Sequence, residues 1–514
     1  MNTITDALVA RLCARVSAST SDTLSTVEVY TGGTLAKVPR SSPQDVAEAV
    51  EAARVAQRAW ANVTVANRIA IFERFHALVL EHSEQVLDLL QAETGKSRRD
   101  AFLEAASPLV TVGYYARKAP KLLAPQRREG MMPLLVKATE LRAPKGVVGI
   151  ITPWNYPFSL AFTDSIPALI AGNAVVLKPD TQTALTTLFG VDLLYQAGLP
   201  HGLLRVVLGD GPVVGTAIVD TADYVGFTGS TRTGREIAAR AGERLIGCSL
   251  ELGGKNPLLV LADANIAKAA VGAVQTCFSN SGQLCMSPER LLVNTDIHDA
   301  FVARFLAEVN RMKLAATYDY SADMGSLTSQ RQLDTVAAHV EDAREKGATV
   351  LAGGRARPNI GPFFYEPTVL TDVAPGMLCY DNETFGPVVS IYRVVDDAEA
   401  VSRANDTAFG LNASIYSRSI PHAELVAARL SAGTVNINDG HIVGFGSADA
   451  PMGGMKDSGV GHRNGTEGLL KYTEAQNVSV QKVPLTTPPR WLPYGLFARN
   501  MRAVFKLFRK AGIR

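Results

Sequence analysis

The strongest constraint on the fold is an alternation of short apolar runs and longer helical segments between residues 146 and 252. The runs are rich in valine, isoleucine and leucine, and they read VVGIIT, AVVLKP, LRVVLG and DYVGFTG. Continuous apolar runs of this length indicate strands that are covered on both faces, and hence a parallel sheet built from β-α-β units. We therefore predict an α/β domain whose ligands bind at the carboxyl ends of the strands.

A second alternating region follows, from residue 254 to about 435. Its apolar runs are NPLLVL, RLLVN, PVVSIYRV, ASIYS and TVNIN, with helical stretches at 264–279 and 296–312. Ahead of both regions, residues 42–125 carry a mostly helical pattern that opens with Ser42 as a cap and Pro43 in the first turn. Two successive α/β domains predict a cleft between them.

Composition excludes several classes of function. A net charge of +2 over 514 residues provides no field suited to nucleic acid. The cysteines form neither a metal pattern nor a disulfide framework, and they are Cys13, Cys248, Cys277, Cys285 and Cys379. We therefore expect no metal site and a reducing, cytoplasmic location, since the first twenty residues also lack the apolar core of a signal peptide.

Single polar side chains stand at the ends of several predicted strands. Asn155 lies in TPWNYP, Lys178 ends VVLK, and Glu251 precedes a double glycine in SLELGGKNP. A carboxylate in an apolar strand is either a costly charge or a base with a raised pKa. The alternatives are a turn-forming asparagine, a solvated lysine and a capping carboxylate.

Two glycine-bearing turns resemble phosphate sites to different degrees. FTGSTRTG (227–234) ends a strand, turns at Gly229 and begins a helix near Thr233, where backbone N–H groups can bind an anion. A plain β-α turn is the alternative. TGKS (94–97) imitates the end of a P-loop, but Leu90 occupies the position of the required first glycine, so we expect no nucleoside triphosphate there.

Cys285 lies in SNSGQLCMSPER (279–290), a polar stretch that favours a reactive cysteine over a structural one. In order, TPWNYP, VLKP, FTGSTRTG, LELGGKNP, SGQLC and NETFGPV resemble the motifs of the aldehyde dehydrogenase superfamily, over residues 30 to about 480. Within the superfamily, the chain most resembles the NADP-linked succinate-semialdehyde dehydrogenases.

The resemblance implies an aldehyde dehydrogenase-like α/β fold with three parts. These are a Rossmann-like cofactor domain, a second α/β catalytic domain and a small oligomerisation arm, placed at 1–125 with 144–253, at 254–435, and at 126–143 with 470–485. The arm implies a homodimer or a homotetramer.

The resemblance also implies oxidation of a small-molecule aldehyde to a carboxylic acid. Cys285 would attack the aldehyde as a thiolate favoured by local donors or charge, and the Asn155 amide would bind the oxyanion. Glu251 would activate the water that hydrolyses the resulting thioester. A coenzyme-A-acylating relative commonly lacks this glutamate, and a non-enzymatic protein of the same fold would need none of the three residues.

For a nicotinamide cofactor, the resemblance implies binding by Thr152, Trp154, Lys178, Thr181, Gly229, Ser230, Gly234, Glu383 and Phe385. Many NAD-preferring members carry a glutamate three residues after the lysine, where it repels a 2′-phosphate. Here that residue is Thr181, so we expect NADP to be preferred and NAD to be tolerated. The neighbouring Asp180 argues in the opposite direction.

The substrate is less constrained than the reaction. Two arginines that bind the carboxylate in succinate-semialdehyde dehydrogenases are replaced here by Thr163 and Ser279. The overall resemblance favours succinate semialdehyde, whereas the missing arginines favour a neutral aliphatic or aromatic aldehyde. His441 and Ser447 are candidate substrate donors unless their segment is a solvated loop. We expect Arg290 to brace the cysteine loop.

The tail at 486–514 has a different character, because no acidic residue follows Glu474. Apolar residues recur on one side of a predicted helix and basic residues on the other: Phe497, Met501, Val504, Phe505 and Phe508 against Arg499, Arg502, Lys506 and Arg509. Such a helix can lie on an anionic membrane surface, or its apolar face can dock on the protein core or a neighbouring subunit. We favour docking.

Overall fold

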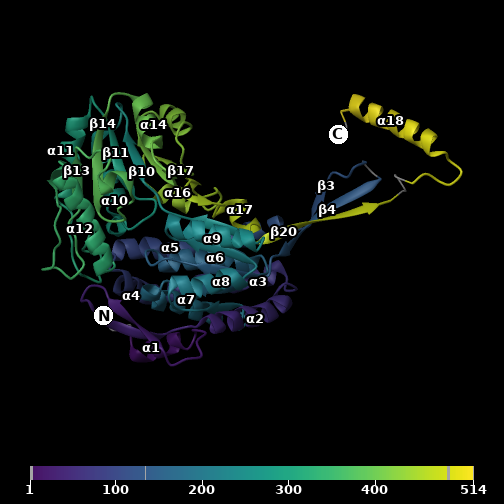
Figure 1. Cartoon of the computed structure of the whole chain (residues 1–514), viewed down its shortest axis with the longest axis horizontal. Helices are drawn as coiled ribbons and strands as arrows, with labels where there is room; N and C mark the ends of the chain where they lie inside the picture. The colour runs from purple at the N-terminus through teal and green to yellow at the C-terminus, as the bar shows by residue number, and fades with distance from the viewer. Residues whose placement is uncertain (1–3, 133–134, 483–486, 513–514) are drawn as a thin grey trace. The chain divides into compact units, whose positions relative to one another are not determined.

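The computed structural model describes residues 4–132, 135–482 and 487–512 (Figure 1). Residues 133–134 and 483–485 of the predicted arm, and residue 486 of the predicted tail, lie outside the described residues. The chain divides into two compact units, Met1–Leu122 with Pro144–Thr473, and Leu123–Ala143 with Glu474–Arg514. Each unit is described by itself.

The first sheet of the larger unit has the strand order β19-β9-β8-β5-β6-β7. Its strands are β5 (Val147–Ile151), β6 (Ala174–Lys178), β7 (Leu204–Val206), β8 (Tyr224–Thr228), β9 (Gly247–Glu251) and β19 (Gly459–Val460). The strands from β9 to β7 pair in parallel, and β19 adds an antiparallel edge. Every residue of β5, β6 and β8 is buried, which confirms the prediction from the continuous apolar runs.

Helices cover this sheet, and Figure 1 shows several of them layered beside one another. The helices that pack directly on its strands include α2 (Pro43–Trp60), α6 (Pro157–Ile170), α8 (Thr216–Thr221) and α9 (Thr231–Glu243). The other helices of this half are α1 (Asp6–Cys13), α3 (Val65–Glu81), α4 (Ser83–Thr94), α5 (Arg98–Leu123) and α7 (Ala184–Gln196). Ser42 caps α2 as predicted, because its side chain accepts from Asp45 N (3.2 Å) and the Asp45 carboxylate accepts from Ser42 N (2.7 Å). A hairpin of β1 (Thr23–Glu28) and β2 (Gly33–Pro39) precedes this helix and was not predicted.

The second sheet has the order β12-β13-β14-β11-β10-β16-β17. Its strands are β10 (Asn256–Val260), β11 (Pro288–Asn294), β12 (Thr349–Ala352), β13 (Thr368–Thr371), β14 (Val388–Val394), β16 (Asn412–Tyr416) and β17 (Thr434–Ile437). Five of these strands coincide with the predicted apolar runs. Strands β12 and β13 were not predicted. Strand β12 is an antiparallel edge strand with exposed positions, and β13 is a buried strand of only four residues that gives no long apolar run.

Both faces of this sheet are covered. Leu258 belongs to an apolar cluster with α10 (Ile266–Cys277) and α11 (His298–Val309), whereas its neighbour Leu259 belongs to a cluster with α14 (Asp397–Asn405) and α15 (Ile420–Ala427). Successive strand residues therefore bury their side chains on opposite faces. The remaining elements of the larger unit include α12 (Gln330–Glu345), α13 (Leu378–Asp381), β15 (Phe409–Gly410), α16 (Ile442–Gly446), β18 (Met455–Lys456) and α17 (Gly465–Leu470).

The smaller unit holds a sheet of order β20-β4-β3 and the C-terminal helix. Its elements are β3 (Gln126–Arg128), β4 (Val136–Pro144), β20 (Thr473–Gln481) and α18 (Tyr494–Lys510). The helix predicted in the tail is confirmed, and none of its described residues is buried. Within the described part of the chain, no helix has the length and apolarity needed to cross a membrane.

Candidate active site

The predicted nucleophile, base and oxyanion donor come from three separate elements of the larger unit. Asn155 stands in the turn between β5 and α6, Glu251 is the last residue of β9, and Cys285 lies between α10 and β11. Asn155 and Cys285 line the same cavity. The charge of Glu251 acts on the Cys285 thiol, so the sequence-distant groups are brought together.

The chain reaches Cys285 through an unusual turn. Asn280, Ser281 and Gly282 have consecutive positive φ angles of 49°, 55° and 70°, a conformation that costs energy for side chains with a Cβ. A Cβ at position 282 would lie 2.0 Å from the carbonyl oxygen of Gly386, so this position requires glycine. The turn is fixed in part by Ser281 Oγ, which donates to Gly325 O (3.1 Å).

The surroundings of Cys285 do not favour a thiolate, and the expectation that they would was wrong. Burial raises the pKa of the Cys285 thiol to about 12, with further contributions from the carboxylates of Glu383 and Glu251. Arg463 opposes these effects only in part. The resting group is therefore a neutral thiol, and its attack requires a proton acceptor.

Glu251 has the properties of such an acceptor. The residue is 5% exposed, and burial raises the pKa of its carboxyl to about 7. Its Oε1 is buried and has no hydrogen-bond partner in the described residues. A carboxyl that titrates near neutral pH and has a free oxygen can take up and release protons at physiological pH.

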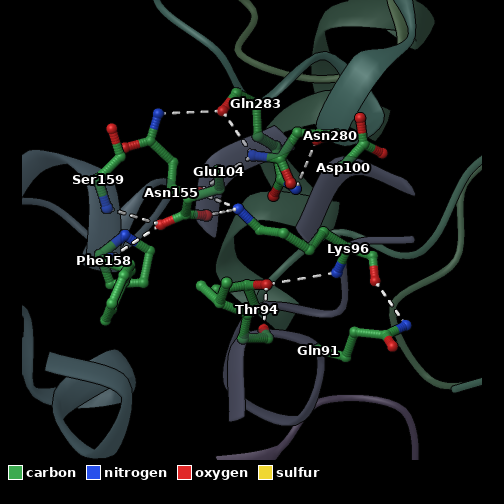
Figure 2. A network of polar contacts seen from close by, with 12 residues as sticks. Gln91, Thr94, Lys96, Asp100, Glu104, Asn155, Phe158, Ser159, Asn280 and Gln283 are labelled. Atoms are coloured by element: carbon green, nitrogen blue, oxygen red, sulfur yellow. Dashed lines mark hydrogen bonds and ion pairs between the residues drawn. The ribbon is translucent and has the colours of Figure 1, made fainter. Parts of the chain in front are cut away.

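Asn155 is held at both its backbone and its side chain (Figure 2). Its Nδ2 donates to Gln283 O (3.0 Å), two residues before Cys285, and its backbone oxygen accepts from Asn280 Nδ2 (3.2 Å). A side-chain amide carries two N–H groups, so one remains for an oxygen at Cys285.

The residues predicted to hold the adenosine end of a cofactor are arranged around β6. Lys178, the last residue of this strand, is 6% exposed and has no carboxylate within ion-pair distance in the described chain. Burial lowers the pKa of its ammonium group, while Asp180 and Asp210 act in the opposite direction. Thr181 opens the short helical turn that follows. A buried cation without a partner suits an anionic ligand group.

The turn from β8 into α9 fits close approach of a ligand. Ser230 caps α9 by accepting from Thr233 N (3.3 Å), so the helix begins at Thr231 rather than near Thr233 as predicted. A Cβ on Gly229 would lie 2.5 Å from the ring of Phe227, and one on Gly234 would lie 2.4 Å from Leu252. A side chain at either position would therefore force its neighbour, Phe227 or Leu252, to move.

The residues predicted for the nicotinamide end meet beside the nucleophile loop. Glu383 Oε1 accepts from Gly254 N (2.9 Å), and burial, with Glu289 nearby, raises the pKa of its carboxyl to about 8. The Phe385 ring contacts the Trp154 ring edge-on at 5.5 Å. In the adjacent turn, the buried Oγ1 of Thr152 has no partner in the described residues.

The cavity that contains Cys285 is largely apolar, with walls that include Leu103, Val110, Leu160, Leu284, Ile442 and Phe445. Thr163 and His441 also line it, and His441 Nδ1 is buried without a partner among the described residues. Ser447 is not part of the lining, and its hydroxyl donates to Val443 O (2.7 Å). Ser279 donates to Asp100 Oδ1 (2.7 Å) and lines a neighbouring cavity.

A charge cluster that was not predicted adjoins this cavity. Asp164 accepts from Arg463 Nε (2.9 Å) and Nη2 (2.6 Å), from Lys471 Nζ (3.1 Å) and from the Tyr472 hydroxyl (3.0 Å). Burial alone would raise the pKa of Asp164, but the two cations hold it well below its usual range. Among the described residues that line the cavity, Arg463 is the only one with a lysine or arginine side chain. The charges of Arg463 and Lys471 also act on the buried Glu251 carboxyl, so the two cations face two carboxyl groups.

The expectation that Arg290 braces the cysteine loop was wrong. Its guanidinium donates to the backbone oxygens of Lys255 (3.0 Å), Arg403 (2.8 Å) and Ala404 (2.8 Å). Because Arg290 lies on β11, inside the sheet, it joins the start of β10 to the end of α14.

Comparison with known proteins agrees with this geometry. A model of the "Aldehyde dehydrogenase family" matches residues 16–478. A protein of Mycolicibacterium smegmatis named "Putative succinate-semialdehyde dehydrogenase", with NADP+ in its name, is 54% identical over 94% of this chain and 93% of its own length. A 4,4'-diapolycopene aldehyde oxidase of a Methylomonas species is 36% identical, over 92% of this chain and 88% of its own length. The crystal structure of succinate-semialdehyde dehydrogenase from Burkholderia pseudomallei superposes with a TM-score of 0.87 at 34% identity, covering 90% of this chain and 96% of that one.

Proposed function

The chain belongs to the aldehyde dehydrogenase family, and we propose that it oxidises succinate semialdehyde to succinate with NADP as the preferred cofactor. The observation that carries the proposal is the meeting of Cys285 and Asn155 in one cavity, with Glu251 within electrostatic reach of the thiol. We further propose that the half built on β5–β9 binds the cofactor and that the half built on β10–β17 carries the nucleophile.

The first step is attack of the Cys285 sulfur on the aldehyde carbon. Because burial keeps the thiol protonated, its proton must leave as the C–S bond forms, and Glu251 is the acceptor with a suitable pKa of about 7. The free N–H of the Asn155 amide donates to the oxygen that becomes negative, a contribution of about 3 kcal/mol in comparable acyl-transfer sites.

A bound NADP would supply the acceptor for the hydride that leaves the substrate carbon. The residues that would hold it are Lys178, Thr181, Ser230 and Glu383 with the aromatic pair described above, and the unpaired buried ammonium of Lys178 fits a phosphate. The acyl group is then a thioester on Cys285. Glu251, which took the thiol proton in the first step, must release it to solvent before the second. The ionised carboxylate then takes a proton from the water that attacks the thioester, the C–S bond breaks as the acid leaves, and the sulfur takes this proton from Glu251.

Cofactor preference is expected to depend on Thr181. Introducing a carboxylate by Thr181→Glu places a negative charge three residues from Lys178 and would repel a 2′-phosphate. We expect the ratio of kcat/KM for NADP to that for NAD to fall by about tenfold or more, which corresponds to about 1.4 kcal/mol. Thr181→Gln is the matched control, since it adds the volume without the charge. An equal loss in both variants, or a native preference for NAD, would refute the assignment.

The choice of succinate semialdehyde is supported by the relatives and by Arg463, whose side chain is the cation in the described lining of the cavity. We expect succinate semialdehyde to exceed a medium-chain aldehyde and benzaldehyde in kcat/KM when the three are assayed with both cofactors. Attraction between the substrate carboxylate and the Arg463 guanidinium in a partly desolvated site predicts an advantage of about tenfold or more.

A neutral aldehyde is the second candidate, because the cavity walls are largely apolar and Arg463 is already paired with Asp164. Thr163 and Ser279 also provide no cation. If benzaldehyde or the medium-chain aldehyde is the better substrate in the same panel, the proposed substrate is refuted, whereas the proposed reaction, oxidation of an aldehyde, is not.

We propose that the protein is a cytoplasmic homodimer or homotetramer. Strand β20 supports this, because its residues after Thr473 are all exposed along a nine-residue strand. For α18 we favour docking of its apolar face on a protein surface over binding to an anionic membrane. We therefore expect the full-length protein and a version ending at Pro488 to co-sediment equally with liposomes rich in phosphatidylserine. Stronger, salt-sensitive binding by the full-length protein would contradict docking and make the enzyme peripheral to the membrane.

A further inference from the structure

The TGKS stretch that imitates a P-loop places a charge inside the molecule. Lys96 is completely buried between α4 and α5, and its Nζ forms an ion pair with Glu104, which is also completely buried. The same Nζ donates to the backbone oxygen of Asn155 (2.8 Å; Figure 2). It also lies 4.2 Å from the centre of the Tyr156 ring. Burial of two charges is costly and often gives no gain in stability over apolar side chains, so the pair calls for another explanation.

The partners of Glu104 supply that explanation. Its Oε1 accepts from the backbone N–H groups of Phe158 (2.8 Å) and Ser159 (3.2 Å), in the first turn of α6. Lys96 therefore holds the start of segment 155–159, and Glu104 holds its end. The ion pair fastens both sides of the turn that presents Asn155.

The other side of this turn is joined to the nucleophile loop. Asn280 Nδ2 donates both to Asn155 O (3.2 Å) and to Gln283 O (3.0 Å), and Gln283 O also accepts from Asn155 Nδ2 (3.0 Å). Figure 2 shows these groups as one continuous network. The position of the Asn155 amide relative to Cys285 thus depends on the buried pair behind it.

We propose that Lys96 and Glu104 are positioning residues that set the Asn155 amide against the oxygen formed at Cys285. The inference rests on the proposed function, because it requires Asn155 to act as the oxyanion donor. A displacement of about 1 Å in such a donor can cost about 100-fold in rate. The loss falls on kcat, since the cofactor residues and the apolar cavity walls are untouched.

A second buried pair provides a matched control at the other half of the site. Lys255 and Glu289 are 3% and 5% exposed at their side chains, and Glu289 accepts from the N–H groups of Thr384 (2.9 Å) and Phe385 (3.0 Å). This pair supports the segment that carries Glu383 and Phe385. Its disruption is expected to raise KM for NADP, whereas disruption of the first pair is expected to lower kcat.

The test uses Lys96→Met, Glu104→Gln, Lys255→Met and Asn155→Ala in the full-length enzyme, with thermal unfolding to establish folding. We expect Lys96→Met to slow the single-turnover formation of NADPH by about 10- to 100-fold, with KM for NADP within about twofold and the rate of Cys285 alkylation by iodoacetamide unchanged. Glu104→Gln keeps an acceptor for the N–H groups of Phe158 and Ser159, so we expect it to slow NADPH formation less than Lys96→Met does. In an Asn155→Ala background, Lys96→Met is expected to have almost no further effect, because the pair acts through Asn155.

Additive losses in the double variant, or a rise in KM for NADP like that of Lys255→Met, would overturn the positioning role. If Lys96→Met alone fails to fold, Lys96→Met with Glu104→Met removes both charges, and a wild-type NADPH rate in that variant would equally refute the proposal. Failure of the proposed function gives a different result, since the wild-type enzyme would then form no aldehyde-dependent NADPH.

Discussion

Replacing Cys285 with alanine is expected to abolish aldehyde-dependent formation of NADPH, with kcat falling by about 10⁴-fold or more. Without the sulfur no thiohemiacetal forms, and neither Asn155 nor Glu251 can compensate, because both act on the covalent intermediate. The measurement is the absorbance of NADPH under saturating aldehyde and cofactor, with folding checked by thermal unfolding.

Cys277 provides the matched control for this result. It ends α10, is 1% exposed and packs in an apolar cluster eight residues before the nucleophile. Cys277→Ala removes one buried sulfur and is expected to lower the free energy of unfolding by about 1 to 2 kcal/mol while leaving kcat near the wild-type value. Undiminished turnover in Cys285→Ala would exclude the covalent mechanism.

Replacing Glu251 with glutamine is expected to lower kcat by about 10² to 10⁴-fold, the usual contribution of a general base. At high pH the first turnover should survive in part, because the thiol can lose its proton to hydroxide, whereas hydrolysis of the thioester still needs Glu251 to activate the water. Rapid mixing should therefore reveal one equivalent of NADPH per active site, followed by a slow phase. A slow phase at the wild-type rate would show that another group activates the water.

The pH dependence follows from the same residue. Glu251 acts as a base only when ionised, and burial raises its pKa to about 7. In the wild-type enzyme kcat should therefore fall about tenfold per pH unit below 7 and level off above it. The fall of kcat below pH 7 should disappear in Glu251→Gln. A wild-type midpoint near the ordinary glutamate value would contradict the role assigned to burial.

The fold was largely predictable because its central strands are covered on both faces and must be continuously apolar. Strands β5, β6 and β8 are examples of such strands. The positions of Lys178 and Glu251 at strand ends could be predicted for the same reason, because each follows directly on an apolar run. Edge strands carry no such signal, which is why β12 and β19 were missed.

The support of the site was not predictable from local sequence. Asp164 meets Arg463 and Lys471 from about 300 positions away, and no periodicity records a pairing of that kind. The sequence around Lys96 shows only that this stretch is not a P-loop. The bond that gives Lys96 its role goes to the backbone oxygen of Asn155, which lies 59 positions further along the chain. The raised pKa of Cys285 is likewise a property of the assembled cavity, because it comes first from burial of the thiol and then from the charges of Glu383 and Glu251.

The central claim is that Cys285 carries the acyl group between oxidation and hydrolysis. Its most direct test is the mass of Glu251→Gln, measured at high pH within seconds of mixing the enzyme with NADP and succinate semialdehyde. The account predicts a gain of one succinyl group, located on the peptide that contains Cys285, and no gain in Cys285→Ala. A full equivalent of NADPH with no added mass, or with the mass on another residue, would contradict it.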